Sequence, residues 1–237
     1  MQQFPYSNKK VLITAGATCE SIDLHSYISS KNNGMLAYSL ANFLVHQGAQ
    51  VIMVSAPVRI DLQHPRLTIY QVQSALEMDA VCCKYFDQVD MVIFGADIPK
   101  YRPERVAPTK KNAENAMYLK MVPNIDIAYE FGRVKSAYQL SVGFAYDHEN
   151  AADPIQKMEK KHFDLIITLP EMETTGFNLN EQAPFGVIEK DYTTHIYQAM
   201  SYTEAAKKIS FAIQHQAHQN EALQFKTGHL NSKSKCA

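Results

Sequence analysis

The architecture of this chain follows from one segment near its start, Lys9-Lys10-Val11-Leu12-Ile13-Thr14-Ala15-Gly16-Ala17-Thr18. A short apolar run that ends at small residues is typical of a buried strand in a parallel sheet. A polar loop follows over residues 19–33, and Gly34 then begins a run with helical spacing that extends to His46. A strand followed by a helix is the first half of a right-handed crossover unit. The segment therefore predicts the start of a Rossmann-like domain.

The loop between this strand and this helix is about fifteen residues long, whereas such connections usually have roughly 2–6 residues. It therefore differs from the dinucleotide-binding fingerprint, in which the strand turns directly into the helix. Ligands of parallel sheets bind beyond the carboxyl ends of the strands, where Gly16 and Thr18 are expected. Asn32 and Asn33 precede Gly34, and a helix that begins there can hold an anion on free backbone N–H groups. The alternative is a Rossmann-like unit with a surface insertion.

Alternating strand and helix patterns continue along the chain and predict a parallel sheet covered by helices. The fold class expected is α/β, with a Rossmann-like, mostly parallel sheet, helices on both faces, and a small antiparallel extension from the late strands. Strands are expected at residues 50–55, 67–72, 90–94, 117–122, 140–144 and 163–169, followed by an antiparallel pair at 185–189 and 194–197. Helices are expected at residues 36–47, 75–86, 125–131, 154–162 and 204–216, with Ser74 and Thr203 as N-caps of the second and the last.

The domain organisation expected from composition is simple. Residues 1–8 form a polar N-terminal extension without the apolar core of a signal peptide. Residues 9–216 form a single α/β domain, and residues 217–237 form a polar tail that is expected to be disordered.

Charge and composition exclude several broad classes of protein. The 237 residues carry a formal net charge of −1, which argues against a general nucleic-acid or membrane-surface binder. No apolar run approaches the ~20 residues of a membrane span. The four cysteines, Cys19, Cys82, Cys83 and Cys236, lack the spacing of a metal site, and no metal ligands are predicted. A soluble cytoplasmic protein is expected, with any nucleotide held in a local pocket.

Three lysines are candidates for binding a polyphosphate. Lys157 and Lys161 are four residues apart and share one helix face. Lys110 lies in a segment over residues 97–115 that contains three prolines and cannot be a helix interior. Each charge-assisted hydrogen bond to a phosphate contributes about 1.5–3 kcal/mol. The alternatives are a solvated basic helix face for the first two lysines and a disordered lid for the third.

Other polar and aromatic residues allow two interpretations each. Glu20 and Asp23 could hold Mg²⁺ or a ligand hydroxyl, or they could stabilise turns and caps. Tyr101 and Phe144 could stack on a base, although Phe144 could equally belong to the core. His215 and His218 face the same side of the last helix and are expected at the surface, because no third ligand lies nearby in sequence.

Several segments together resemble the phosphopantothenate–cysteine ligase family. The family pattern I-T-A-G-G-T-x-E-P-I-D corresponds to residues 13–23, and D-Y-R-P…A-P-E-K-I-K-K corresponds to residues 100–111. Residues 119–127 resemble L-x-x-N-P-D-I, residues 142–145 resemble V-G-F-A, and residues 157–167 resemble K-x-x-x-K-x-x-D-L-I-V. The resemblance covers about residues 9–213 in order and spacing.

The resemblance implies a reaction and the residues that perform it. The carboxylate of 4′-phosphopantothenate attacks the α-phosphate of CTP or ATP, pyrophosphate leaves, and the amine of cysteine then displaces the nucleoside monophosphate from the acyl-nucleotide. It also implies Mg²⁺, no flavin, and a homodimer to which the late strands contribute. By correspondence with the family, the triphosphate is gripped by Lys110, Lys157 and Lys161, and the nucleotide is held by Gly95, Ala96, Asp126, Ile127 and Phe144.

Departures from the family pattern gather on the side of the acid substrate. An asparagine that the family ties to resolving the acyl intermediate is Ser30, an arginine is Ser26, and the lysine of G-K-M-G is Met35. The aspartate before Y-R-P is Lys100, which reverses a charge. Two hypotheses follow: a ligase that stands alone without a flavin-bearing domain, and a divergent relative that binds a nucleotide without ligating or that acts on another acid. The retained lysines argue against a purely structural protein.

Overall fold

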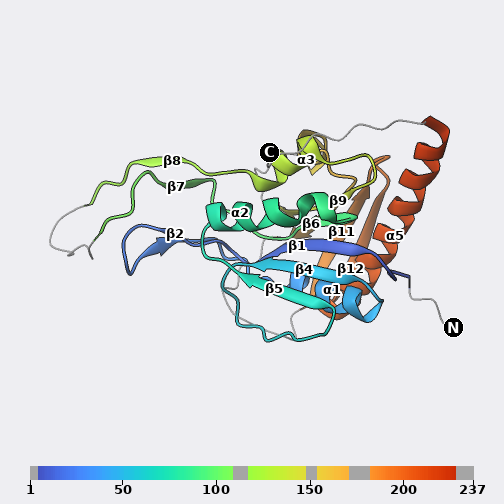
Figure 1. Ribbon diagram of the computed structural model, residues 1–237, viewed down its shortest axis with the longest axis horizontal. Helices are drawn as coiled ribbons and strands as arrows, with labels where there is room; N and C mark the ends of the chain where they lie inside the picture. The colour runs from blue at the N-terminus through green and yellow to red at the C-terminus, as the bar shows by residue number, and fades with distance from the viewer. Residues whose placement is uncertain (1–4, 109–116, 148–153, 171–181, 228–237) are drawn as a thin grey trace.

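A computed structural model of the chain describes residues 5–108, 117–147, 154–170 and 182–227. Within these residues, one eight-stranded sheet has the order β12-β11-β10-β9-β6-β1-β4-β5 (Figure 1). The pairs from β5 to β10 are parallel, whereas β11 and β12 join antiparallel. The bounds are β1 (Lys10–Ala15), β4 (Gln50–Ser55), β5 (Leu67–Gln71), β6 (Met91–Phe94), β9 (Leu140–Asp147), β10 (Leu165–Pro170), β11 (Gln182–Glu189) and β12 (Thr194–Ser201).

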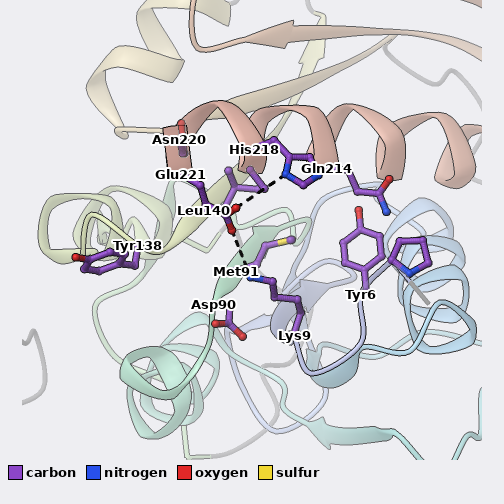
Figure 2. A pocket seen from close by; sticks show the side chains of 12 residues that line it. Tyr6, Lys9, Asp90, Met91, Tyr138, Leu140, Gln214, His218, Asn220 and Glu221 are labelled. Atoms are coloured by element: carbon purple, nitrogen blue, oxygen red, sulfur yellow. Dashed lines mark ion pairs between the residues drawn. The ribbon is translucent and has the colours of Figure 1, made fainter. Parts of the chain in front are cut away.

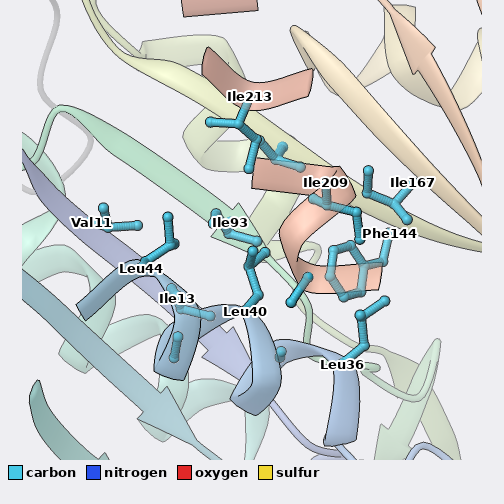
Figure 3. Close-up of a cluster of buried hydrophobic side chains, with 14 of the residues drawn as sticks. Val11, Ile13, Leu36, Leu40, Leu44, Ile93, Phe144, Ile167, Ile209 and Ile213 are labelled. Atoms are coloured by element: carbon cyan, nitrogen blue, oxygen red, sulfur yellow. The ribbon is translucent and has the colours of Figure 1, made fainter. Parts of the chain in front are cut away.

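Helices cover both faces of this sheet, which confirms the predicted Rossmann-like α/β class. One face packs against α1 (Met35–His46) and α5 (Tyr202–Thr227), and Figure 3 shows Leu40 and Ile209 meeting over Ile93 of β6. The other face packs against α2 (Ala75–Tyr85), the 3₁₀ turn η1 (Phe86–Gln88), α3 (Ile127–Val134) and α4 (Pro154–Lys160). The core therefore has two layers, one on each side of the sheet.

The apolar run in β1 is continuous because the strand is buried on both faces. Val11 and Ile13 point into the core beneath α1 and α5, and Leu12 points into the core beneath α2. All three side chains are fully buried. At about 25 cal/mol per Å² of apolar surface, fully burying one such side chain contributes roughly 1.5–3 kcal/mol. This strand therefore anchors the parallel sheet, as its sequence predicts.

Two short antiparallel ladders lie outside the main sheet, and in Figure 1 they project together from one end of the molecule. One joins β2 (Glu20–Ser21) to β3 (Tyr27–Ile28), and the other joins β7 (Tyr101–Pro103) to β8 (Met121–Pro123). The strand predicted over residues 117–122 is therefore wrong in extent and position, because only its end pairs, and its partner is the segment predicted as a loop. The local apolar pattern could not show that the partner strand is β7.

The C-terminal helix corrects the predicted tail. Helix α5 continues to Thr227, so the disorder predicted for residues 217–227 is wrong; residues 228–237 lie outside the described part of the chain. Once the first turns of α5 pack on the sheet, further turns add one hydrogen bond for each residue ordered, and a polar helix can continue into solvent. The predicted N-terminal extension packs on the same helix, because the hydroxyl of Tyr6 donates to the carbonyl of Ser210 at 2.7 Å.

The N-caps of two helices test the local sequence signals. Ser74 accepts from the N–H of Glu77 and caps α2, as predicted. The predicted cap Thr203 is wrong, because α5 begins at Tyr202. Ser201 takes this role, since its hydroxyl accepts from the N–H of Glu204 at 3.3 Å while the Glu204 carboxylate accepts from the N–H of Ser201 at 3.1 Å. This reciprocal pair is a capping box.

Candidate functional site

The segments that follow β1 and β6 stay side by side beyond the ends of the strands. The N–H of Gly95 donates to the carbonyl of Thr14 at 3.1 Å, and the N–H of Ala96 donates to the Thr14 hydroxyl at 3.2 Å. Further out, the N–H of Asp97 donates to the carbonyl of Gly16 at 2.9 Å. These bonds place two predicted ligand-binding segments together at the carboxyl edge of the sheet, where parallel sheets bind their ligands.

The long first loop returns to this edge before α1 begins. Gly16 and Gly34 have φ angles of +77° and +73°, and a Cβ on Gly34 would lie 3.2 Å from the Gly16 nitrogen. The Asn32 side chain accepts from the N–H of Gly34 at 2.7 Å, and its amide nitrogen donates to the Gly95 carbonyl at 3.4 Å. Asn33 accepts from the N–H of Met35 at 3.0 Å and occupies one of the free donors at the start of α1. Four of the five predicted substrate-binding residues therefore cluster here.

The fifth, Thr18, is a buried connector. Its hydroxyl donates to the Glu20 carboxylate at 2.9 Å, and Glu20 also accepts from the N–H of Ala75 at the start of α2. Asp23 accepts from the N–H groups of His25 and Ser26 at 2.7 Å each. For both carboxylates, the structure supports the interpretation as turn and cap stabilisers over the interpretation as Mg²⁺ ligands.

Phe144 of β9 closes the inner side of the edge. A Cβ on Gly95 would lie 3.3 Å from the Phe144 ring and 3.0 Å from the side chain of Ala37 in α1. Figure 3 shows the ring directed toward Leu36 and Ile209, and only 7% of the residue is exposed. Its ring therefore belongs to the core and leaves little face for a base, whereas Tyr101 on β7 is exposed.

The ammonium groups of Lys157 in α4 and of Lys161 just after it contact two different elements. The Lys157 ammonium donates to the carbonyl of Phe144 at 2.8 Å, and the Lys161 ammonium donates to the Asp126 carboxylate at 2.7 Å. Asp126 also accepts from the N–H of Tyr129 and so caps α3, whose first residue, Ile127, is buried. The solvated-face alternative is therefore wrong for both lysines, because each has a partner on another element.

The charges near Lys157 form one electrostatic neighbourhood. The pKa of Lys157 is lowered to about 8, mainly by burial and also by the positive charges of Lys161 and Lys100, against the opposing effect of Asp97 and Asp126. A buried ammonium close to other ammonium groups is stabilised by a bound anion. Sequence reasoning identified Lys100 only as a reversed charge and did not place it beside Lys157.

Ser30, two residues before Asn32 in the chain, has an unsatisfied hydroxyl. Its oxygen is buried and has no hydrogen-bond partner among the described residues. Leaving such a group without a partner costs about 1–3 kcal/mol, so it is a candidate to bind a ligand. Lys110, the third predicted phosphate ligand, lies outside the described residues. Within the described part of the chain, no cluster of three or more metal-ligating side chains occurs.

A cavity of about 260 Å³ lies at the opposite edge, near the amino ends of β1, β6 and β9. Figure 2 shows α5 above it, with Lys9 and His218 both directed toward Glu221 at 3.7 and 3.9 Å. The His218 side chain is largely exposed, as predicted for the surface. His215 is also at the surface, where it contacts the buried Glu189 carboxylate at 2.9 Å. This cavity is therefore separate from the edge that holds Gly95 and Lys157.

Comparison with known proteins gives a family match and several longer relatives. A family model described as the DNA/pantothenate metabolism flavoprotein C-terminal domain matches residues 6–216. The Coenzyme A biosynthesis bifunctional protein CoaBC of Borreliella burgdorferi is 32% identical over 208 residues, which are 85% of this chain and 51% of that protein. A Cysteine/Cysteine sulfinic acid decarboxylase from an unknown prokaryotic organism is 30% identical over 208 residues, which are 86% of this chain and 58% of that protein. The chain thus spans about half the length of these curated relatives.

A solved structure shares the arrangement of the chain. The crystal structure of the C-terminal domain of Coenzyme A biosynthesis bifunctional protein CoaBC matches with a TM-score of 0.76 and 26% identity, over 91% of this chain and 99% of that one. No helix in the described residues has both the length and the apolar character needed to cross a bilayer.

Proposed function

Because the chain belongs to the family of the DNA/pantothenate metabolism flavoprotein C-terminal domain, we propose that it ligates cysteine to 4′-phosphopantothenate in coenzyme A biosynthesis. The reaction uses CTP or ATP and passes through an acyl-nucleotide. The observation that carries the proposal is the position of Lys157 and Lys161, whose ammonium groups turn to the carboxyl edge beside Phe144 and Asp126. The CoaBC relatives support the same reading.

The first step places the positive charges around the triphosphate. Lys157 and Lys161, together with Lys110, neutralise the pyrophosphate that leaves when the substrate carboxylate attacks the α-phosphorus, forms a new P–O bond and breaks the α–β bridge. Preorganised cations are effective here because charge develops on the leaving group in a site that excludes water. The nucleoside lies along Gly95, Ala96 and the Asp126–Ile127 turn, with Phe144 as the inner wall.

The second step joins the amine of cysteine to the activated acyl carbon. The neutral amine attacks and loses a proton to solvent, the tetrahedral oxyanion collapses, and the nucleoside monophosphate leaves with the C–O electron pair. The Ser30 hydroxyl donates a hydrogen bond to the acyl oxygen as negative charge develops on that oxygen. The acid substrate lies against the loop formed by Gly16, Thr18, Asn32, Asn33 and Gly34. Mg²⁺ enters this proposal only as a companion of the nucleotide, and flavin has no part in it.

We also propose an oligomeric state and a cellular location for the chain. The chain acts on small molecules in the cytoplasm as a homodimer, without nucleic acid or membrane, and the late strands contribute to the dimer. Strand β12 supports this, because it is an edge strand and Ile196 on it is 83% exposed. An open edge strand with an exposed apolar side chain is a natural surface for a second copy.

A second candidate function is nucleotide binding without ligation, or ligation of a different acid. The substitutions at Ser30 and Met35 favour it, because they lie on the acid side while the phosphate-side lysines are retained. The relative named a cysteine and cysteine sulfinic acid decarboxylase also shows that curated relatives of this chain carry more than one name.

One assay separates these candidates. Purified protein is mixed with 4′-phosphopantothenate, cysteine, Mg²⁺ and either CTP or ATP, and pyrophosphate and the ligated product are followed. Release that depends on the acid and is lost in Lys157→Ala, but not in the control Lys160→Ala, supports the ligase. Saturable nucleotide binding without release supports the second candidate. Absence of both would remove both candidates.

A further inference from the structure

Position 100 has a lysine where the resemblance leads one to expect an aspartate, and the backbone holds it at the nucleotide edge. The N–H of Asn124 donates to the carbonyl of Lys100 at 2.9 Å, and the Asn124 side chain donates to the carbonyl of Pro99 at 3.1 Å. Two residues after Asn124, Asp126 binds the ammonium of Lys161. The backbone of Lys100 is therefore held beside the turn that carries Asp126, the carboxylate partner of Lys161.

The charge of Lys100 acts on Lys157. The side chain of Lys100 is exposed, and it has no ion-pair partner within the described residues. It nevertheless acts on Lys157, because it is among the charges that lower the pKa of that ammonium. Three lysine charges thus act in one region against the two carboxylates Asp97 and Asp126, and the surplus of positive charge favours an anion there.

Among the described residues, this region offers a protein-held magnesium ion one carboxylate without an ammonium partner, Asp97, and three nearby lysine charges oppose the binding of a cation there. Mg²⁺ in nucleotide sites is usually bound by one or two carboxylates together with the phosphates. The acids that act on Lys157 are Asp97 and Asp126, but Asp126 already accepts from Lys161 and from the N–H of Tyr129. The positive charge at position 100 adds repulsion toward a cation.

We propose that Lys100 binds the triphosphate and, with Lys157 and Lys161, replaces the charge neutralisation of a protein-held Mg²⁺. The chain then binds its nucleotide with little dependence on the ion. This inference rests on the proposed nucleotide binding and makes Lys100 a residue that sets the metal dependence of the site. A charge-assisted contact to phosphate is worth enough to change the affinity by about tenfold or more.

The test measures CTP and ATP binding to the full chain by calorimetry, once in EDTA and once with excess Mg²⁺. The wild-type protein is expected to bind with dissociation constants that differ by less than about threefold between the two conditions. Lys100→Asp should weaken binding in EDTA by about tenfold or more and regain affinity when Mg²⁺ is added. Lys100→Arg keeps the positive charge and should behave like the wild type. Lys208→Asp, a matched charge reversal on the exposed face of α5, is the control.

The outcomes separate this inference from the proposed function. If the wild type binds nucleotide only with Mg²⁺, or if Lys100→Asp and Lys208→Asp have equal effects, the role of Lys100 is wrong while nucleotide binding stands. If the wild type binds neither nucleotide in either condition, the proposed function fails as well. Circular dichroism spectra of all variants identify any loss of folding, and Lys100→Gln, which removes the charge without reversing it, should weaken binding in EDTA and retains the test if the aspartate variant does not fold.

Discussion

Among single residues, Lys157 matters most for the proposed site, because its buried ammonium contacts a core strand and interacts with the charged groups around it. Its ammonium donates to the Phe144 carbonyl, so the helix face that carries it is held against β9. Burial lowers its pKa to about 8, close enough to neutrality for its charge to change within an accessible pH range. The affinity of any anion bound to an ammonium with such a pKa depends on pH.

We expect the affinity for nucleoside triphosphate to fall as the pH rises from 7 to 9. The protonated ammonium binds phosphate, and with a pKa of about 8 it is roughly nine-tenths charged at pH 7 and roughly one-tenth charged at pH 9. The affinity should therefore fall several-fold, up to about tenfold, in titrations across this range. Lys157→Arg keeps its charge and should flatten the profile, whereas Lys160→Arg should leave it unchanged. A flat wild-type profile would contradict the role of Lys157.

The same pKa shift makes the free energy of unfolding change with pH in the opposite direction to the nucleotide affinity, when no nucleotide is bound. The unfolded lysine titrates near 10.5 and the folded one near 8, so the unfolded chain binds more protons between these values. Stability contributed by this group therefore rises with pH over that window.

At the scale of elements, the proposed nucleotide site depends on how closely α3 and α4 approach. Gly132 lies in α3, and a Cβ there would lie 1.9 Å from the Lys161 carbonyl oxygen at the end of α4. The contact is with backbone, which cannot rotate away. These two helices supply Asp126 and Lys161, which form the ion pair of the site. Packing between the helices thus sets the position of the charged groups.

Replacing Gly132 with alanine should reveal this dependence. Alanine favours a helix over glycine by about 1 kcal/mol, but the clash forces the helices apart and should cost about 1–3 kcal/mol net of that gain. Denaturant unfolding should show this loss, and nucleotide affinity should weaken because Lys161 moves. Ala128→Gly, in the same helix, is a control for helix propensity. An alanine variant as stable as the wild type, with unchanged affinity, would contradict the packing account.

A buried polar network ties further elements together below the site. Asp164 accepts from Lys135 at the end of α3, from Lys190 at 2.8 Å after β11, and from the N–H of Ser141 at 2.9 Å in β9. Burial acts to raise the pKa of the Asp164 carboxyl, but the charges and hydrogen bonds of Lys135 and Lys190 together outweigh it, so the pKa is lowered. A lowered carboxyl pKa contributes stability above the unfolded value, and that stability is lost as the pH falls through the folded value.

At the scale of the whole molecule, the sheet has two different edges. Strand β5 ends one side, and the antiparallel pair β11 and β12 ends the other. Strand β12 presents mostly exposed side chains, and the buried Glu189 on β11 contacts His195 and His215 behind it. Strand β12 is therefore held by contacts on its inner side and leaves its outer edge exposed, which suits contact with another copy.

The proposed homodimer gives a test at this scale. Light scattering coupled to size exclusion should report a dimer for the wild type. Ile196→Lys should shift the mass toward the monomer, because a lysine at an edge strand opposes pairing with another chain. Leu76→Lys changes an exposed apolar residue on α2 and should not change the mass. A monomeric wild type would remove the dimer from the proposal, and a dimer unaffected by Ile196→Lys would place its interface elsewhere.

Local signals in the sequence determined most of the elements and the local setting of several candidate site residues. The run Val11-Leu12-Ile13 predicted a strand buried on both faces, Ser74 predicted a helix start, and the spacing of Lys157 and Lys161 predicted one shared face. These features depend on residues close together in the chain, so period, caps and turn chemistry suffice to find them.

Only the tertiary structure decided which distant groups meet. Contacts across the fold decide which carbonyl accepts from Lys157 and bring the charge of Lys100 close enough to act on it. They also decide the pairing of β7 with β8 and the extension of α5 to Thr227. No local pattern encodes such contacts, because they arise when separate elements pack and the entropy of closing the intervening chain is offset by the whole core. Burial then changes the chemistry of a side chain that the sequence shows simply as a lysine.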